Sequence, residues 1–351
     1  MKSNFSSWDV EDQKMLDTLG HFSNSDFKQD ERALSVLMRR GRVLLVFKNK
    51  SGELLKGLSL YQGQSLVARV ALRMIKITAV FTRSFWFLPI YSPSRDGVVK
   101  DLLSHRPGGV VSVLLGNPAH ESRRAIIWVR QSQGDEIVWK VGISEEARGL
   151  IAKEAAVLAS LAGGGLEIPK SLDFLQKEGY TALCIPFIRG NSCSWEDRVQ
   201  IATLLSGWLE ARSSPAPVEL DLGRLSSKLG AVPSLFLTPA IQHGDFAAWN
   251  VLKTSSGELS VIDWEMGKKN GIPGWDLVHW LIQEARLVKK CSPAEVCQRV
   301  GEQLLDPAFS EYLGQAGWGS ATDWLLGSYL VHFENDPSFN CEEHLSVFLN
   351  E

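Results

Sequence analysis

Apolar residues along the middle of the chain follow two different spacings. Four short runs rich in apolar residues are bounded by polar residues or Gly, which is typical of strands. Before the last of them lies a longer run in which Leu150, Ile151, Leu158 and Leu161 recur at helical spacing. The predicted order is strand, strand, strand, helix, strand, at 110–115, 124–130, 136–141, 145–161 and 181–187.

The carboxyl-terminal part has a mainly helical pattern, interrupted by one predicted hairpin. Residues 251–253 and 259–262 are short apolar-rich runs around the turn signal 254–257. Such a hairpin brings Asn250 and Asp263 side by side at its open end. Helices are predicted at 195–211, with Ser194 as the N-cap, and at 277–289, 293–305, 321–334 and 342–349.

The first hundred residues combine a polar segment, 1–35, with a basic one. Residues 36–100 hold twelve Lys or Arg against Glu53 and Asp96, a net charge of +10, whereas the whole chain carries −3. The polar segment 1–35 is predicted to contain one short helix, at residues 10–19. The predicted elements are that helix, 10–19, then strands at 42–47 and 54–61, and a helix at 65–81 in which Arg69, Arg73 and Lys76 recur opposite apolar residues.

Two interpretations of the basic segment stay open. A basic amphipathic helix followed by Phe85-Trp86-Phe87 suits an anionic membrane surface or an anionic polymer. The alternative, which we favour, is a small module that packs on the next domain with its charges solvated. Nucleic-acid binding is not expected, because no interleaved aromatic and basic motif occurs.

Length and composition indicate a cytoplasmic globular protein with two or three domains. The chain has 351 residues, 44% of them hydrophobic and 22% charged. Its five cysteines form no C-x-x-C pair, which favours reduced, buried thiols over a disulfide framework or a zinc site. No apolar segment of signal-peptide length begins the chain, and no stretch long enough for a transmembrane helix occurs.

One polar motif has the spacing of a catalytic segment. Asp245 and Asn250 are five residues apart, and Asp263 follows beyond the predicted hairpin. Phosphoryl transfer uses one carboxylate to accept the proton of an attacking hydroxyl, while an amide oxygen and a second carboxylate hold Mg²⁺ on the ATP phosphates. The spacing from Asp to Asn is that of the protein-kinase pattern H-R-D-x-x-x-x-N. An ordinary turn is the alternative for H-G-D alone, but the hairpin and the second Asp favour the catalytic interpretation.

The segment His243-Gly244-Asp245-Phe246-Ala247-Ala248-Trp249-Asn250, followed by Ile262-Asp263-Trp264-Glu265, resembles the aminoglycoside phosphotransferase and choline kinase families. It is also similar to predicted phosphotransferases of bacterial surface-glycan gene clusters. The resemblance covers about half the chain, 110–281. It implies an α+β, two-lobed protein-kinase-like fold, with a small antiparallel sheet lobe and a mainly helical lobe. It also implies an ATP- and Mg²⁺-dependent kinase for a hydroxyl of a small molecule, such as a sugar, a glycan intermediate or an amino alcohol.

The resemblance assigns roles to individual residues. Asp245 is implied as the base and His243 as the brace of its loop, with Asn250 and Asp263 as metal ligands. Asp276 is implied to accept backbone amides of the loop, although an acid at a helix N-terminus is the simpler interpretation. Among the nearby tryptophans, which are more often core residues, Trp249 is the best candidate for substrate contact. Glu265 is the second substrate candidate.

The nucleotide is expected to meet the strand-rich part. Lys140 lies on the third predicted strand, in Ile137-Val138-Trp139-Lys140, and resembles the phosphate-binding lysine of kinases. Glu154, fourteen residues later, is its expected partner, with Glu145 and Glu146 as alternatives. The loop from Gly116 to Ser122 is the candidate phosphate loop, although it lacks the G-x-G-x-x-G form. Ile188 begins the candidate adenine-binding hinge.

The sequence thus predicts four segments and two alternatives for function. The segments are 1–35, a basic module at 36–108, a sheet lobe at 109–188, and a helical lobe at 189–351 with its catalytic segment at 241–266. The first alternative is the small-molecule kinase. The second is a nucleotide-binding pseudokinase that serves as a scaffold or regulator. For both alternatives, a peripheral membrane contact through residues 36–100 stays open.

Overall fold

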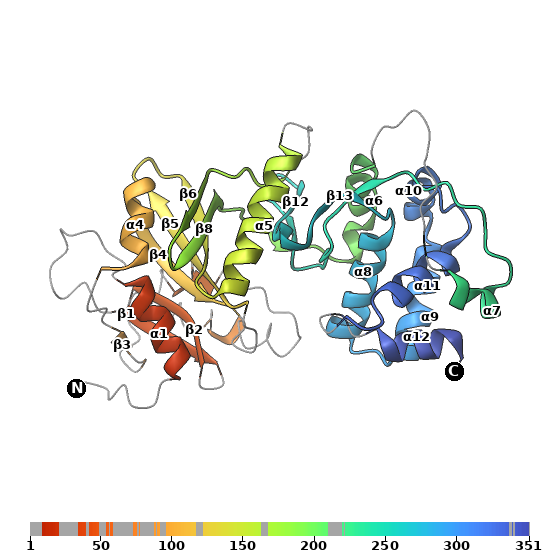
Figure 1. Ribbon diagram of the computed structural model, residues 1–351, viewed down its shortest axis with the longest axis horizontal. Helices are drawn as coiled ribbons and strands as arrows, with labels where there is room; N and C mark the ends of the chain where they lie inside the picture. The colour runs from red at the N-terminus through yellow and green to blue at the C-terminus, as the bar shows by residue number, and fades with distance from the viewer. Residues whose placement is uncertain are drawn as a thin grey trace. The chain divides into compact units, whose positions relative to one another are not determined.

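The structure, a computed structural model, divides into two compact units (Figure 1). One unit is Met1–Ala159 with Pro169–Phe187, and the other is Ser160–Ile168 with Ile188–Glu351. The residues that the structure describes are 9–20, 34–39, 42–48, 54–55, 57–58, 73–75, 77, 88, 90–91, 96–116, 122–162, 168–209, 220, 222–336, 339 and 341–350.

One antiparallel sheet forms the centre of the first unit. Eight strands run in the order β3-β1-β2-β4-β5-β6-β8-β7. Strands of the basic segment therefore continue the sheet of the following segment, and Leu45 of β2 pairs with Leu114 of β4. The strands are β1 (Leu34–Arg39), β2 (Arg42–Lys48), β3 (Ile90–Tyr91), β4 (Gly108–Leu115), β5 (Arg124–Gln131), β6 (Glu136–Gly142), β7 (Asp173–Lys177) and β8 (Tyr180–Pro186).

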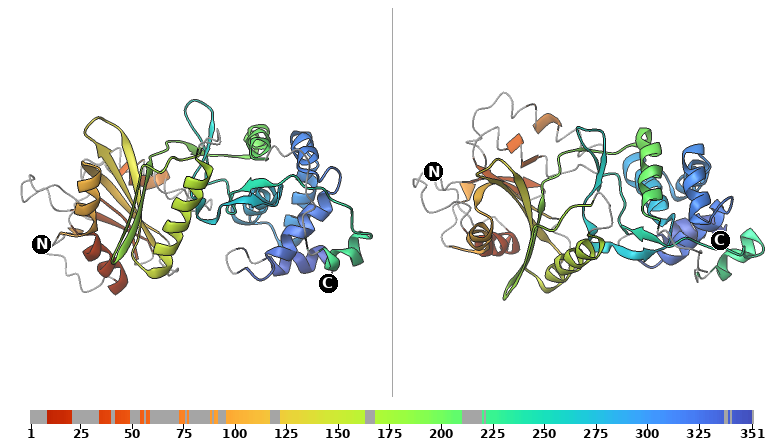
Figure 2. Two further views of the ribbon diagram at one scale, coloured as in Figure 1. Left: turned by 45° about the horizontal axis from the view of Figure 1, so that its top comes forward. Right: turned by 90° about the horizontal axis from the view of Figure 1, so that it is seen from above.

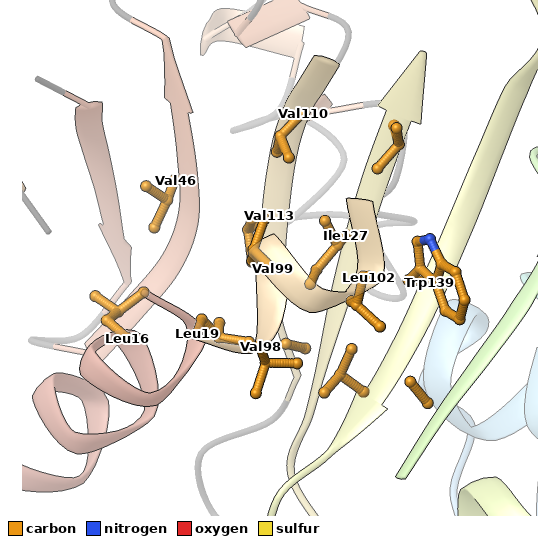
Figure 3. Packing of buried hydrophobic residues seen from close by; sticks show 14 of the residues in the cluster. Leu16, Leu19, Val46, Val98, Val99, Leu102, Val110, Val113, Ile127 and Trp139 are labelled. Atoms are coloured by element: carbon orange, nitrogen blue, oxygen red, sulfur yellow. The ribbon is translucent and has the colours of Figure 1, made fainter. Parts of the chain in front are cut away.

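Helices cover both faces of this sheet. On one face, α1 (Val10–Leu19) and α4 (Val98–His105) pack apolar side chains against the strands in one core, which Figure 3 shows around Val113 and Trp139. On the opposite face lies α5 (Glu145–Leu161) (Figure 2). Successive strand residues point to opposite faces. Because Trp139 faces the core, the next residue, Lys140, faces α5.

Most predicted elements of this unit are confirmed. The strands predicted at 110–115, 124–130, 136–141 and 181–187 correspond to β4, β5, β6 and β8. The helices predicted at 10–19 and 145–161 are α1 and α5, with the same bounds. Strands β1 and β7 and helix α4 were not predicted.

The predicted hairpin of the basic segment is wrong in its second strand. Leu54 and Gly57 are helical, and Leu54 and Leu58 are both 1% exposed in one apolar cluster. A spacing of four places both leucines on one face of a helix and on one face of a strand alike, so this pattern did not separate the two. The partner of β2 is β1, with Arg39 opposite Arg42.

The helix predicted at 65–81 is described only in part. Residues 73–75 and 77 are helical. Arg69, Lys76 and the run Phe85-Trp86-Phe87 lie outside the described residues, so the membrane interpretation stays a prediction. None of the described helices combines the length and apolar character that crossing a membrane requires.

The second unit is mainly helical and confirms the α+β class. Two small antiparallel sheets include strands of the catalytic segment: β10 (Ala240–Gln242) pairs with β13 (Lys268–Gly271), and β11 (Val251–Lys253) pairs with β12 (Leu259–Val261) and β9 (Asn191–Ser192). The longer helices are α6 (Arg198–Gly207), α8 (Trp275–Gln283), α9 (Pro293–Leu304), α10 (Pro307–Ala316), α11 (Thr322–His332) and α12 (Glu342–Leu349), and the short ones are η4 (Trp195–Asp197), η5 (Gly223–Leu225), α7 (Ser226–Leu229), η6 (Trp264–Met266) and the π-helix η7 (Glu284–Lys289).

The predicted hairpin is present, helical structure occurs in all five predicted helical regions of this unit, and α10 was not predicted. Ser194 precedes η4, and its N–H and hydroxyl both donate to the carboxylate of Asp197 in a capping box. That carboxylate also lies 2.6 Å from the Lys253 ammonium of β11. Burial raises the pKa of Asp197, but the hydrogen bonds from Lys253 and Ser194 outweigh this effect and lower it. The capping box therefore anchors the hairpin to the first helices of this unit.

Candidate active site

The loop between β10 and β11 is held by two predicted braces. Asp276, at the start of α8, accepts the N–H of His243 at 2.7 Å and the N–H of Gly244 at 2.9 Å. The His243 ring bridges the loop and the hairpin, because Nε2 lies 2.9 Å from the Ile262 carbonyl oxygen and Nδ1 accepts the N–H of Asp245 at 3.2 Å. These contacts assign the His243 proton to Nε2. Both braces are thus present, and complete burial raises the pKa of Asp276.

Gly244 explains why the motif carries glycine where protein kinases carry arginine. Its φ is +84°, in the left-handed region that side chains rarely adopt. A Cβ at this position would lie 2.6 Å from the Met266 carbonyl oxygen. The close approach of the loop to η6 therefore requires a residue without a side chain.

Asp245 presents a fixed and partly exposed carboxylate. Its Oδ2 accepts from Asn250 Nδ2 at 3.0 Å, and its Oδ1 lies 3.0 Å from His279 Nε2. Asn250 Nδ2 also donates to the Asp245 carbonyl oxygen at 2.9 Å. The Asp245 side chain is nevertheless 33% exposed. Because each carboxylate oxygen has two acceptor positions, this group can still accept a proton from an incoming hydroxyl.

Asn250 and Asp263 flank the open end of the hairpin, as predicted. Val251 pairs with Val261, and the Ile262 N–H donates to the Asn250 carbonyl oxygen at 2.9 Å. Since the nitrogen of the Asn250 amide is bound to Asp245, its oxygen Oδ1 is the end available to a cation. Asp263 has φ 73° and ψ 58°. A non-glycine residue in this region costs about 1–3 kcal/mol, and such strain is concentrated at functional sites.

The donor set fits a hard divalent cation. One amide oxygen and one half-buried carboxylate are oxygen ligands of the kind that Mg²⁺ prefers, and Mg²⁺ commonly takes few protein ligands beside phosphates and water. No sulfur or imidazole ligand lies in this pair. Asn250 and Asp263 therefore match the chemistry of the metal predicted from the sequence.

In the first unit, the predicted ion pair is present. Lys140 Nζ lies 2.6 Å and 2.9 Å from the two carboxylate oxygens of Glu154. The side chains are 8% and 1% exposed. A buried ammonium needs such a partner, because an unpaired charge in the interior is strongly unfavourable. Glu145 and Glu146, the alternative partners, lie in the first turn of α5 and are exposed.

For the other predicted site residues, the structure gives burial and backbone contacts but no contact that indicates a role. Gly116 donates its N–H to the Arg124 carbonyl oxygen at 2.8 Å, and Ser122 is half-buried. Residues 117–121 of the candidate phosphate loop lie outside the described residues. Ile188, Trp249 and Glu265 are half-buried. The remaining tryptophans of the region are core residues, with exposures of 0% for Trp264, 3% for Trp275 and 0% for Trp280.

His279 is a residue of this site that the sequence patterns did not predict. The ring is 1% exposed, with Nε2 toward Asp245 and Nδ1 at 2.6 Å from the Tyr329 hydroxyl. A signal for this contact exists in the sequence. His279 follows Asp276 by three residues on one helix, so a helix that presents Asp276 to the loop presents His279 there too.

Several solved structures are similar to this chain, at low identity. One is aminoglycoside phosphotransferase APH(4)-Ia in complex with ADP and hygromycin B, with 15% identity, a TM-score of 0.45, and coverage of 72% of this chain and 97% of that one. Another is macrolide 2'-phosphotransferase MphH from Brachybacterium faecium, with 14% identity, a TM-score of 0.39, and coverage of 71% and 96%. A third is amicoumacin kinase hAmiN in complex with AMP-PNP, Ca²⁺ and Ami, with 12% identity, a TM-score of 0.39, and coverage of 68% and 87%.

No protein-family model and no curated protein matches the chain. The similar structures named above are small-molecule phosphotransferases or kinases, whereas the predicted link to surface-glycan gene clusters finds no support among them. TM-scores below 0.5 leave the function of this chain to be inferred from its own residues.

Proposed function

We propose that this chain is an ATP- and Mg²⁺-dependent phosphotransferase that moves the γ-phosphoryl group to a hydroxyl of a small molecule. The observation that carries the proposal is the carboxylate of Asp245. Hydrogen bonds from Asn250 and His279 hold this carboxylate, yet it is one third exposed. Its loop also carries Asn250, one of the two proposed metal ligands. A carboxylate that is held in one orientation and still accessible can accept a hydrogen bond from an incoming hydroxyl.

Asp245 would act on the acceptor hydroxyl. Its carboxylate takes the proton as the hydroxyl oxygen forms a bond to the γ-phosphorus, and the bond from that phosphorus to the β,γ-bridging oxygen breaks, releasing ADP. The hydrogen bonds from Asn250 and His279 hold the carboxylate in one orientation, so that no reorganisation is needed when the hydroxyl arrives.

Each unit carries its own candidate groups for the phosphates of ATP. Asn250 Oδ1 and the Asp263 carboxylate would bind Mg²⁺, which neutralises charge on the phosphate oxygens when bound. Lys140, kept in place by Glu154, would bind phosphate oxygens as a point charge. The backbone between Gly116 and Ser122 is the candidate cover for the phosphates, and Ile188 begins the candidate contact with adenine.

A sugar, a glycan intermediate or an amino alcohol is the proposed acceptor class. Trp249 and Glu265 are half-buried; Trp249 directly precedes Asn250, and Glu265 follows Asp263 by two residues. An aromatic face suits the C–H surface of a sugar or an alkylammonium group, and a carboxylate suits hydroxyl or ammonium donors. Trp249→Ala should therefore raise KM for the acceptor and leave the affinity for ATP unchanged.

A screen of hydroxyl-bearing metabolites with ATP and Mg²⁺ tests the proposal. Release of ADP that depends on one acceptor, together with a phosphorylated product of matching mass, is the expected result. Asp245→Asn is the matched control, because it keeps the shape and removes the base, so turnover should be lost while calorimetry still detects ATP binding. ATP binding by the wild type without transfer to any acceptor would favour the pseudokinase scaffold instead.

A further inference from the structure

Asp245 is part of a three-residue hydrogen-bonded chain that reaches into the core of the second unit. His279 Nε2 lies 3.0 Å from Asp245 Oδ1, and His279 Nδ1 lies 2.6 Å from the Tyr329 hydroxyl. His279 and Tyr329 are each 1% exposed, so water does not compete for these bonds. We propose that His279 is a positioning residue, which holds the Asp245 carboxylate in the orientation that accepts the hydroxyl proton, while Tyr329 sets the tautomer of His279.

The direction of the hydrogen bonds follows from chemistry. The Asp245 carboxylate only accepts, so Nε2 of His279 must carry the proton between them. In a neutral ring, Nδ1 is then an acceptor and receives a hydrogen bond from the Tyr329 hydroxyl. Burial raises the pKa of Tyr329 well above its ordinary value, which keeps this hydroxyl protonated. The Tyr329 hydroxyl thus donates to His279, and His279 donates to Asp245.

Packing leaves the imidazole one orientation. The Phe339 ring stands edge-on to the His279 ring with centroids 4.6 Å apart, and Tyr329 lies on another side at 6.1 Å. Helix α8 also fixes the loop through Asp276, one turn before His279. One helix therefore sets both the backbone of the loop and the plane of the Asp245 carboxylate, with Asn250 holding the second carboxylate oxygen.

The inference rests on the proposed phosphotransfer, because positioning matters only if Asp245 is the base. Loss of the Nε2 donor frees the carboxylate to rotate about its Cβ–Cγ bond. A misplaced base costs roughly 10²-fold in rate. Binding of ATP is not expected to change, since His279 contacts Asp245 and not the proposed metal ligands.

Substitutions at His279 separate positioning from mere packing. His279→Leu keeps much of the volume and removes the donor, so kcat should fall roughly 10²-fold while KM for ATP stays within about twofold. His279→Gln retains an N–H donor and should recover kcat to within roughly tenfold of the wild type. His332→Gln, at an exposed histidine outside the chain of hydrogen bonds, is the control and should leave kcat unchanged. Equal impairment of the Leu and Gln variants would overturn the proposal.

A second measurement does not depend on turnover or on a folded Leu variant. Nitrogen-15 NMR of histidine-labelled full-length protein should show His279 as the neutral tautomer with its proton on Nε2. Tyr329→Phe removes one oxygen atom and should shift this signal and lower kcat roughly threefold to tenfold. A His279 proton on Nδ1, or a signal that does not respond to Asp245→Asn, would overturn the assignment. If the wild type transfers phosphate to no acceptor, the proposed function fails, and this spectrum still decides whether His279 donates to Asp245.

Discussion

Replacing Asp276 by alanine should loosen the catalytic loop more than any other single truncation there. Asp276 is 4% exposed and accepts two backbone N–H groups, from His243 and Gly244. The alanine variant leaves both donors buried without a partner. Each lost hydrogen bond to a charged acceptor costs about 1.5–3 kcal/mol, so the variant should lose roughly 3–6 kcal/mol. This is a large fraction of the 5–15 kcal/mol that is typical of a whole domain.

Hydrogen exchange measures this loss where it occurs. A loss of about 3 kcal/mol raises the exchange rate of the His243 and Gly244 amides by roughly 150-fold, if they exchange by local opening. Urea unfolding followed by tryptophan fluorescence supplies the total change in free energy of the unit. Asp276→Asn keeps one acceptor oxygen and should fall between the wild type and the alanine variant.

Asp306→Ala is the matched control for these measurements. Asp306 is also an acid at a helix N-terminus, where its Oδ1 accepts the N–H of Ala308 at 2.9 Å. Its removal should cost about 0.5–2 kcal/mol and leave exchange in the catalytic loop unchanged. The reasoning is refuted if Asp276→Ala costs less than this control, or if the amides of His243 and Gly244 exchange at the wild-type rate.

Three further outcomes are expected. Glu154→Gln leaves the buried Lys140 ammonium beside a neutral group, so calorimetry should show ATP affinity weakened at least about tenfold, and an unchanged affinity would contradict the proposed role. Gly244→Ala forces a side chain into a left-handed backbone beside the Met266 carbonyl oxygen and should lower the free energy of unfolding in urea by about 1–3 kcal/mol; no loss would argue against the close approach. Burial raises the pKa of Asp12, but hydrogen bonds from two arginines and one backbone N–H outweigh it and depress the pKa below 3.8. The stability that Asp12 contributes is therefore present above about pH 4 and lost as the pH falls through its lower folded value. The difference in unfolding free energy between wild type and Asp12→Asn should shrink from pH 6 to pH 3, and a constant difference would contradict the assignment.

The sequence predicts the site well where chemistry imposes local spacing. Asp245, Asn250 and Asp263 are tied by one loop and one hairpin, so their proximity follows from short-range geometry. The pairing of Lys140 with Glu154 follows from one strand and the next helix, whose bounds are those predicted. The roles of these residues in binding nucleotide and metal remain predictions.

Contacts between distant segments explain what the sequence analysis missed. Tyr329 is fifty residues beyond His279, and no spacing rule connects a histidine on α8 to a hydroxyl on α11. Strand β1 was not predicted, because the boundary placed between residues 35 and 36 divides the run Leu34–Arg39. Propensity and residue spacing predict single helices and strands. The order of strands in a sheet depends on pairing between segments that are distant in sequence, which these patterns do not contain.

The shared sheet of the first unit has a practical consequence for dissecting the protein. Deleting residues 36–108 as if they were a self-contained module would remove β2, the partner of β4. The N–H and C=O groups on that edge of β4, which are paired in the intact chain, would then be exposed. It would also remove α4 from the apolar face that Val113 and Trp139 help to form. Such a truncated chain invites aggregation, so lost activity or lost membrane affinity would reveal nothing about the basic residues. Charge reversal at exposed positions, such as Arg73→Glu, leaves the strands intact and is the sounder way to examine this segment.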